Sequence, residues 1–472
     1  MIKELSKMIG KIVEIKGWVD TVREHGKIIF LEIRDISGTV QTVAVMKNEE
    51  VFKNAKKVSK ESSVRVKGIV NSRPAGTENK NSVAGSVELK IEEFEILNLC
   101  PPLPFDLDNK DTSEEIRLKY RYLDLRRKEM QKNLLTRAKV IKIIRNHFDL
   151  NNFNEVETPM LVKSTPGGAR NYLVPSRLEA GKFWALPESP QLFKQLLMVG
   201  GMERYYQIAK CLRDEDLRKD RQPEFTQLDV EMSFITQEDI ISLIEKLIAK
   251  IWKEILNVDV PIPFKRMTYK DAMEKYGIDR PDLRPETKEK YAFLWVVDFP
   301  LFQYDKAEKK YVANHHPFTS PNLEDFKKDP HTARSVAYDI VLNGIEIGGG
   351  SIRIHNQEVQ QKVFEILQIS KEEQESKFKF LLDALKFGAP PHGGIALGID
   401  RLMMMILETE NIRDVVAFPK NAEGRDVMLE APSEVTEKQL KELFIKIDAP
   451  KKELSKETHT FPNEKKVEKK KK

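Results

Sequence analysis

The sequence predicts an α+β protein built from two domains, and three observations support this prediction. The chain has 472 residues, which exceeds what one ordinary hydrophobic core accommodates. Residues 11 to about 97 read as short strands separated by turns, whereas the following part mixes helix-like segments with strands that look largely antiparallel. The three prolines of "PPLPFDLDNKD" separate these two parts. We therefore expect a first domain over residues 1–104, a hinge over 105–130, a second domain over 131–448, and a Lys-rich, disordered tail over 449–472.

The first domain contains five segments with strand character, bounded by Gly, Asn and Asp turns: residues 11–20, 27–35, 39–45, 63–71 and 86–97. Five short strands in so few residues favour a small β-barrel of the oligonucleotide-binding (OB) type. A β-domain with a purely structural role is the alternative.

The second domain begins with a basic helix-like segment and continues into "ESPQLFKQLLMVGG". Ser189 and Pro190 fit the cap and the first residue of a helix. Gln191 and Lys194 then share one helical face.

A long hairpin follows, formed by "YYQIAKCLR" and "EFTQLDVEMSF" around a charged loop. In its second strand Thr226, Leu228, Val230 and Met232 alternate with Phe225, Gln227, Asp229 and Glu231. The apolar side of this strand is predicted to face the hydrophobic core. On the polar side, Phe225 offers a ring for stacking, and Arg213 in the loop offers a planar fork suited to phosphate. Plain solvent exposure of this face is the alternative.

A second hairpin, "SVAYDIVLNGIEIGGGSIRIH", carries Asn343 and Gly344, which is the strongest short signal for a two-residue turn. That turn places Asp339 and Glu346 diagonally on one face, roughly 7 Å apart. Two carboxylates at this distance repel each other unless a cation lies between them, and Mg²⁺ bound with a nucleotide would suit. Two exposed acids on a sheet edge are the alternative.

The segment "GGIALGIDRLMMMI" runs from a Gly-rich strand into a helix with Arg401 in its first turn. A cation at this end opposes the helix dipole by roughly 0.3–1 kcal/mol. We therefore expect an anion beside Arg401, either Asp400 or a bound phosphate.

Composition and charge exclude several classes of protein. A hydrophobic share of 40% with a net charge of +5 describes a soluble globular chain, which permits a polyanionic partner without requiring one. Cys100 and Cys211 lie far apart, so we expect neither a disulfide framework nor a zinc site, and this fits the cytoplasm. The most apolar stretch is interrupted by Asp400 and Arg401, so we expect no membrane span.

Together these segments resemble a class II aminoacyl-tRNA synthetase, and in particular an aspartyl-tRNA synthetase of the bacterial type. The three motifs of the class are similar to "FNEVETPML" with Pro159, to the hairpin around Arg213, and to "GIALGIDRLMMMI" with Arg401. Family-specific strings are "RYLDLRR", "SPQLFKQLLM", "HHPFTSP" and "GGGSIRIHN". The resemblance covers residues 1 to about 448. It implies an OB-fold anticodon-binding domain followed by a class II catalytic domain.

The resemblance also implies a role for individual residues. ATP would be bound by Arg213, Glu215, Phe225, Gln227, Glu346 and Arg401, of which Arg213 and Arg401 would also act in catalysis. L-Aspartate would be bound by Ser189, Gln191, Lys194, Asp229, His315, His316 and Arg353. Asp339 and Glu346 would hold Mg²⁺.

The implied macromolecular partners are tRNA(Asp) and a second copy of the chain. The anticodon would contact Arg23, His25, Phe30, Gln41 and Glu88. Relaxed family members, which also charge tRNA(Asn), tend to have His at the position of His25, whereas strict members tend to have Leu. We therefore expect tRNA(Asn) to be charged as well, with a solvated turn residue as the alternative. Because the first motif forms the subunit interface in this class, we expect a homodimer.

Two features depart from the family pattern. Gly167 stands where a Glu would contact the substrate ammonium, and the inserted domain that bacterial members carry between the second and third motifs is missing. Asparaginyl- and lysyl-tRNA synthetases share the architecture, so the pocket must decide between amino acids. A synthetase-like paralogue that activates an amino acid without tRNA, or only binds RNA, is a further alternative.

Overall fold

The structure is a computed structural model that describes residues 1–164 and 170–448. The chain divides into two compact units, Met1–Thr112 and Ser113–Lys472, which are described separately below. The segment predicted as a hinge spans this division. Its part from Ser113 belongs to the second unit, where Arg121 donates hydrogen bonds to the carbonyls of Arg413, Val416 and Ala417. The predicted tail lies outside the described residues.

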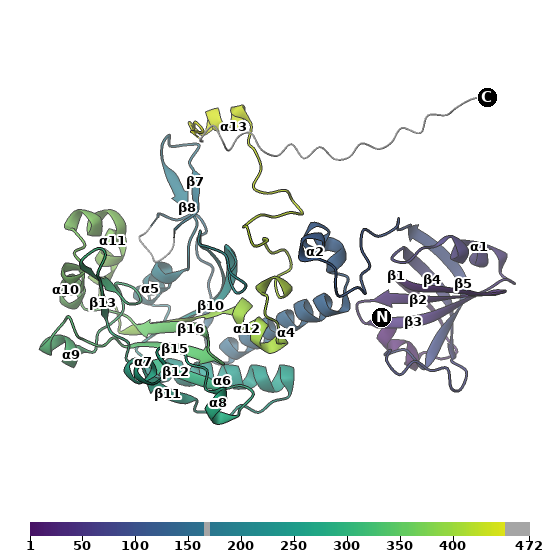
Figure 1. The fold of residues 1–472 in the computed structure, drawn as a ribbon, viewed down its shortest axis with the longest axis horizontal. Helices are drawn as coiled ribbons and strands as arrows, with labels where there is room; N and C mark the ends of the chain where they lie inside the picture. The colour runs from purple at the N-terminus through teal and green to yellow at the C-terminus, as the bar shows by residue number, and fades with distance from the viewer. Residues whose placement is uncertain (165–169, 449–472) are drawn as a thin grey trace. The chain divides into compact units, whose positions relative to one another are not determined.

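The first unit is a closed barrel with strand order β1-β2-β3-β5-β4 (Figure 1). Its strands are β1 (Ile12–His25), β2 (Ile28–Asp35), β3 (Gly38–Val45), β4 (Ser63–Ser72) and β5 (Val87–Asn98). Alternate residues such as Ile29, Leu31 and Ile33 fill the barrel interior, as the period of two requires. Two short helices, η1 (Ile2–Lys7) and α1 (Glu49–Lys57), pack on the same core. The barrel confirms the predicted OB-type domain.

The second unit is organised around an eight-stranded sheet with the order β11-β12-β15-β16-β17-β10-β9-β6. The strands are β6 (Asn154–Glu155), β9 (Arg204–Leu212), β10 (Glu224–Ser233), β11 (Lys265–Thr268), β12 (Phe293–Val297), β15 (Ala337–Leu342), β16 (Ile345–Ile352) and β17 (His392–Gly398). Only the outermost pairs, β11 with β12 and β6 with β9, are parallel. The predicted, mainly antiparallel sheet is therefore confirmed. Two small hairpins pair β7 (Leu173–Pro175) with β8 (Phe183–Ala185) and β13 (Phe302–Asp305) with β14 (Lys310–Ala313).

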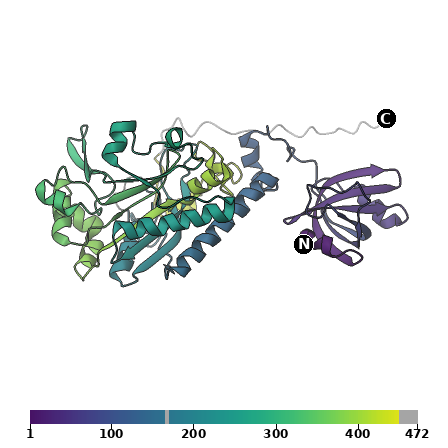
Figure 2. The same cartoon turned by 90° about the horizontal axis from the view of Figure 1, so that it is seen from below.

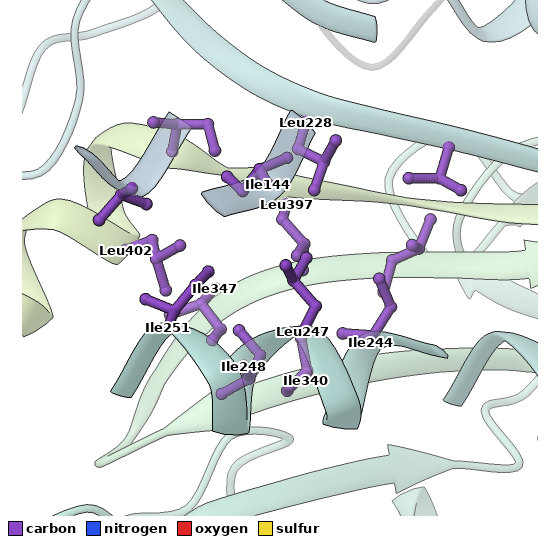
Figure 3. Packing of buried hydrophobic residues seen from close by; sticks show 14 of the residues in the cluster. Ile144, Leu228, Ile244, Leu247, Ile248, Ile251, Ile340, Ile347, Leu397 and Leu402 are labelled. Carbon is purple, nitrogen blue, oxygen red and sulfur yellow. The ribbon is translucent and has the colours of Figure 1, made fainter. Parts of the chain in front are cut away.

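One face of this sheet is covered by two long helices, α4 (Lys128–Leu150) and α6 (Gln237–Leu256), which pack against each other (Figure 2). A capping box between Thr236 and Asp239 starts α6. Ile244 and Leu247 of α6 then lie against Ile340 and Leu397 of the sheet (Figure 3). The large core of the unit therefore lies on this face.

The unit contains further helices, of which α12 (Ile399–Leu407) packs on the same large core through residues such as Leu402 and Met403. They are α2 (Glu114–Lys119), α3 (Arg121–Asp124), α5 (Gln191–Val199), α7 (Tyr269–Tyr276), α8 (Arg284–Thr287), α9 (Leu323–Lys328), α10 (Gln357–Ile366), α11 (Lys371–Leu385), α12 (Ile399–Leu407), η2 (Ile412–Asp414) and α13 (Glu437–Glu442). Within residues 1–164 and 170–448, none of the helices is both long and apolar enough to cross a membrane.

Candidate active site

A cavity of about 540 Å³ opens on the sheet face opposite the large core. Its wall includes most of the residues predicted to bind substrate: Ser189, Gln191, Arg213, Glu215, Phe225, Gln227, Asp229, His315, Asp339, Glu346 and Arg401. The alternation of β10 explains this, since Leu228 and Val230 face the core while Gln227 and Asp229 face the cavity. Three predicted residues, Lys194, His316 and Arg353, are instead connected to the cavity through buried ion pairs and hydrogen bonds.

One end of the cavity carries two arginines suited to a polyanion. The guanidinium carbon of Arg213 lies 5.1 Å from the ring centroid of Phe225. The buried Nε of Arg213 has no hydrogen-bond partner among the described residues. Arg401 donates to the carbonyl of Glu346 at 3.0 Å and pairs with Asp220 at 3.2 Å. An aromatic ring beside a guanidinium, with a second arginine in the same cavity, can hold a nucleotide base and its phosphates.

Asp339 and Glu346 both line this end of the cavity, although a bulge alters the predicted register. Val341 pairs with Glu346, as the turn predicts, but the bulge places Asp339 opposite Gly349. Burial and the nearby charge of Asp339 raise the pKa of Glu346 above its usual value. Two carboxylates that disfavour each other's charge fit a hard divalent cation such as Mg²⁺.

At Asp229 the cavity wall joins a network of four buried charged side chains that pair with one another, here called the floor; of the four, Asp229 lines the cavity itself. Lys194 Nζ lies 2.5 Å from Asp229 Oδ1 and 3.2 Å from Glu231 Oε2. Arg353 donates to Glu231 at 2.9 Å through Nε, and to His316 Nε2 at 2.7 Å through Nη1. The sequence prediction did not assign Glu231 to the site, although its position on the polar side of β10 is the signal that could have found it.

The two acids of the floor respond differently to burial. Burial raises the pKa of Asp229, and the adjacent Lys194 does not fully offset this. Burial has the same tendency at Glu231, but Arg353 and Lys194 together outweigh it and lower the pKa of Glu231. Enclosure by the protein and the Arg353 charge hold the pKa of His316 well below its usual value. The floor is therefore a balanced set of two cations and two acids with a neutral imidazole.

Two buried atoms beside the floor remain available for a ligand. Asp229 Oδ2 and Gln191 Nε2 make no hydrogen bond within the part of the chain that the structure describes. Helix α5 begins at Gln191 with Pro190 as its cap, one residue later than predicted, which leaves Ser189 in the cavity wall. An acceptor and a donor at this position can orient an amino acid through its ammonium and carboxylate groups.

Glycines make room for the charged floor and for the acids of β15 and β16. A Cβ atom at Gly394 would overlap Glu231 Oε2 and the carbonyl of Val230. A Cβ atom at Gly349 would overlap Asp339 Oδ1. These positions require glycine because of the close approach of neighbouring carboxylates.

Two family models match the chain. The model described as tRNA synthetases class II (D, K and N) matches residues 113–422, which is more than half of the chain. The model described as OB-fold nucleic acid binding domain matches residues 13–97. This chain belongs to the class II tRNA synthetases.

Similarity to curated relatives shows to which family of class II synthetases this synthetase belongs. It is 44% identical to the aspartate–tRNA(Asp/Asn) ligase of Hydrogenobaculum sp. (strain Y04AAS1), with 93% of this chain and 98% of the relative covered. It is 43% identical to the ligase of the same name from Caldanaerobacter subterraneus subsp. tengcongensis, with 94% and 97% covered. The synthetase therefore belongs to the aspartate–tRNA ligase family, which confirms the predicted family and enzyme class.

The same alignments bear on the missing inserted domain. The alignment with the Hydrogenobaculum protein extends over 579 positions, whereas this synthetase has 472 residues. That relative therefore has residues without a counterpart here.

Solved structures share the fold of the synthetase. Asparaginyl-tRNA synthetase from Pyrococcus horikoshii complexed with asparaginyl-adenylate has a TM-score of 0.72 and 25% identity, with 88% of this chain and 95% of that chain covered. Aspartyl-tRNA synthetase from Entamoeba histolytica also has a TM-score of 0.72, with 24% identity and coverage of 89% and 91%. The second comparison shows the fold alone.

In the barrel, the residues predicted to bind the anticodon lie on paired strands. Arg23 pairs with Phe30 across β1 and β2, and the His25 ring lies 6.1 Å from the Phe30 ring. Gln41 donates to Glu88 at 2.9 Å and accepts from Arg73 at 3.0 Å. Sequence reasoning did not include Arg73, which lies outside the predicted strands. The remaining departure from the family pattern, Gly167, lies outside the described residues.

Proposed function

We propose that this synthetase activates L-aspartate with ATP and transfers the aspartyl group to both tRNA(Asp) and tRNA(Asn). One observation carries the choice of amino acid: two buried cations, Lys194 and Arg353, belong to an ion-pair network that reaches the cavity wall at Asp229, and Arg213 and Arg401 line the same cavity. A side-chain carboxylate suits the first pair, and triphosphate suits the second. Lys194 and Arg353 would repel a lysine ammonium, and an asparagine amide would not offer these two cations the negative charge of a carboxylate.

The reaction needs no protein nucleophile. The α-carboxylate of aspartate attacks the α-phosphorus of ATP, the bond to the β-phosphate oxygen breaks, and pyrophosphate leaves. Arg213 neutralises the charge that develops on the α-phosphate, and Phe225 stacks on the adenine. Asp229 accepts a hydrogen bond from the substrate ammonium. Mg²⁺ held by Asp339 and Glu346 would neutralise further phosphate charge.

The second step transfers the amino acid. A hydroxyl of the 3′-terminal adenosine of tRNA attacks the carbonyl carbon of the aspartyl-adenylate, and AMP leaves with the bonding electron pair. The barrel supports this step because Arg23, Phe30 and Gln41 offer charge, a stacking ring and an amide to the anticodon. The small number of cysteines suits a reducing compartment, and we assign the enzyme to the cytoplasm.

We infer a homodimer from apolar side chains around the first motif. Met160 and Leu161 are 41% and 49% exposed, and Phe183 and Trp184 are 49% and 46% exposed. These pairs are neighbours, since Val162 and Ala185 form a β-bridge. Four large apolar side chains in one exposed region fit a self-complementary interface. Sedimentation should give twice the chain mass at assay concentration, and a fully active monomer would contradict this inference.

Separate aminoacylation of purified tRNA(Asp) and tRNA(Asn) tests the proposal. We expect kcat/KM for the two tRNAs to differ by less than about a hundredfold, because the His25 ring can hydrogen-bond either pyrimidine at the third anticodon base. His25→Leu should raise the preference for tRNA(Asp). Lys306→Leu, on an exposed turn of the second unit, is the control. A preference above a hundredfold in the wild type would exclude tRNA(Asn), and charging with asparagine would exclude aspartate.

A further inference from the structure

Asp400 is a buried carboxylate that joins three segments of the second unit. It is the second residue of α12, directly before Arg401, and is 3% exposed. Its Oδ1 accepts a hydrogen bond from Arg137 Nη1 at 2.5 Å, and its Oδ2 accepts one from the backbone N–H of Thr226 at 2.8 Å. The sequence alternative, in which Asp400 compensates Arg401, is therefore not what its contacts show, because Asp220 pairs with Arg401.

The contacts of Asp400 bear directly on the end of the cavity that carries Arg213, Phe225 and Arg401, here called the nucleotide end. Thr226 lies between Phe225 and Gln227, which both line the cavity, and Arg401 follows Asp400 in the chain. Asp400 thus connects the strand that carries the stacking ring to the helix that carries the second arginine. Both oxygens are fixed, so the carboxylate sets how far apart these two groups lie.

Arg137, which lies on α4, binds the other oxygen of the Asp400 carboxylate. Its Nη1 also donates to the carbonyl of Val415 at 3.3 Å, just after η2. In η2, Ile412 lines the cavity and donates its backbone N–H to the carbonyl of Lys219 in the β9–β10 loop. Arg137 itself is not among the described residues that line the cavity. Among the described residues, its hydrogen bonds therefore link it to the site through Asp400 and the segment around Val415.

We propose that Arg137 and Asp400 are positioning residues that set the spacing between Phe225 and Arg401 for ATP. Without Arg137, the buried Asp400 carboxylate would lose its charged partner and could turn toward Arg401. It would then compete with phosphate for that guanidinium. This inference rests on the proposed use of ATP but does not depend on which amino acid or tRNA is served.

The proposal predicts that loss of Arg137 affects the binding of ATP and the binding of aspartate differently. Lys194 of the floor lies on α5, Glu231 lies on the later part of β10, and Arg353 follows β16. Among the described residues, their ion pairs and hydrogen bonds do not involve Arg137 or Asp400. Loss of Arg137 should therefore change recognition of the nucleotide and leave recognition of the amino acid nearly unchanged. A general loosening of the unit would change both.

Pyrophosphate exchange by the full chain tests the proposal. For Arg137→Ala we expect KM for ATP to rise at least tenfold, while KM for aspartate stays within twofold. Arg137→Lys keeps one cation on a flexible stem, so its KM for ATP should rise about threefold. Arg266→Ala is the matched control, because it removes an arginine that forms a bidentate pair with Glu238 on the surface. Its KM values should match those of the wild type.

ATP-induced stabilisation gives a second readout that does not need turnover. The rise in thermal midpoint on adding ATP should be largely lost in Arg137→Ala and kept in Arg266→Ala. Equal increases in both KM values, or a KM for ATP within twofold of wild type in Arg137→Ala and Arg137→Lys, would overturn the proposal. If the wild type catalysed no exchange with any amino acid, the proposed function would fail, while the thermal measurement would still test this inference.

Discussion

The two ends of the cavity hold their charges in different ways. At the floor, Lys194, Asp229, Glu231 and Arg353 are at most 2% exposed and neutralise one another. At the nucleotide end, the side chain of Arg401 is 27% exposed and that of Asp339 is 17% exposed. The charges of the floor are thus enclosed by the protein, whereas those of the nucleotide end are partly open to solvent.

This difference predicts which substitutions lower the stability of the fold and which lower only the affinity for substrate. Removing one partner at the floor leaves a buried charge without its counterion, so we expect floor substitutions to lower stability as well as affinity. Solvent reaches the guanidinium of Arg401 in the free protein, so we expect substitutions of the arginines at the nucleotide end to change binding and catalysis more than stability. Three substitutions test this comparison, and they are ordered by expected effect.

Arg353→Leu should produce the largest combined effect. Glu231 would lose two hydrogen bonds, and we expect unfolding free energy to fall by about 3–5 kcal/mol. Because the substrate carboxylate would lose a cation as well, kcat/KM for aspartate should fall by more than 2 kcal/mol in equivalent free energy, roughly thirtyfold. Urea unfolding followed by tryptophan fluorescence and pyrophosphate exchange measure the two quantities. Arg284→Leu, which breaks an exposed pair with Asp282, is the control. An unchanged unfolding curve would show that the ion pairs of the floor do not contribute to the stability of the folded protein.

Arg213→Ala should affect activity alone. Loss of a charged donor to the α-phosphate should lower the rate of pyrophosphate exchange by about 10²–10³-fold. The unfolding midpoint should stay within about 1 °C, since the Arg213 side chain is only half-buried. Arg218→Ala, an exposed arginine of the same loop that does not belong to the described cavity wall, is the comparison variant. A large loss of stability in Arg213→Ala would contradict the distinction between the two ends.

Glu346→Gln should change stability less than Arg353→Leu does, and in the opposite direction. A neutral amide removes the repulsion with Asp339, so the ligand-free protein should melt roughly 1–3 °C higher. Exchange activity should nevertheless fall, because the cation would lose a carboxylate ligand. Glu231→Gln provides the contrast, since the same change at the floor should lower the melting temperature. If both variants moved the melting temperature in the same direction, the comparison would be wrong.

Local sequence patterns were sufficient for the five barrel strands and for the hairpins β9–β10 and β15–β16, whereas short strands such as β7, β8, β13 and β14 were not predicted. The alternation from Phe225 to Met232 predicted which side of β10 is core, because a period of two depends only on neighbouring residues. The Asn343–Gly344 turn likewise predicted that Val341 pairs with Glu346. The bulge that follows was missed, since a single extra residue in a strand leaves little trace in the sequence.

Long-range ion pairs could not be predicted in the same way. Asp400 meets a partner 263 residues away on α4, and Arg353 meets one 122 residues away on β10. The sequence shows that a charge lies in an apolar segment and therefore needs a partner, but it does not show which one. The resemblance assigned Lys194 and Arg353 to the amino acid, whereas their pairing with Glu231 required the structure.

Gly394 has a consequence for how the site would be mapped experimentally. Alanine scanning reads importance from atoms that are removed, and at this position alanine adds one. Its methyl group would overlap Glu231 Oε2 from the neighbouring strand, so the substitution would displace a charge that it does not alter. A scan that skips glycines would therefore pass over a position that fixes Glu231 by the space that it leaves open.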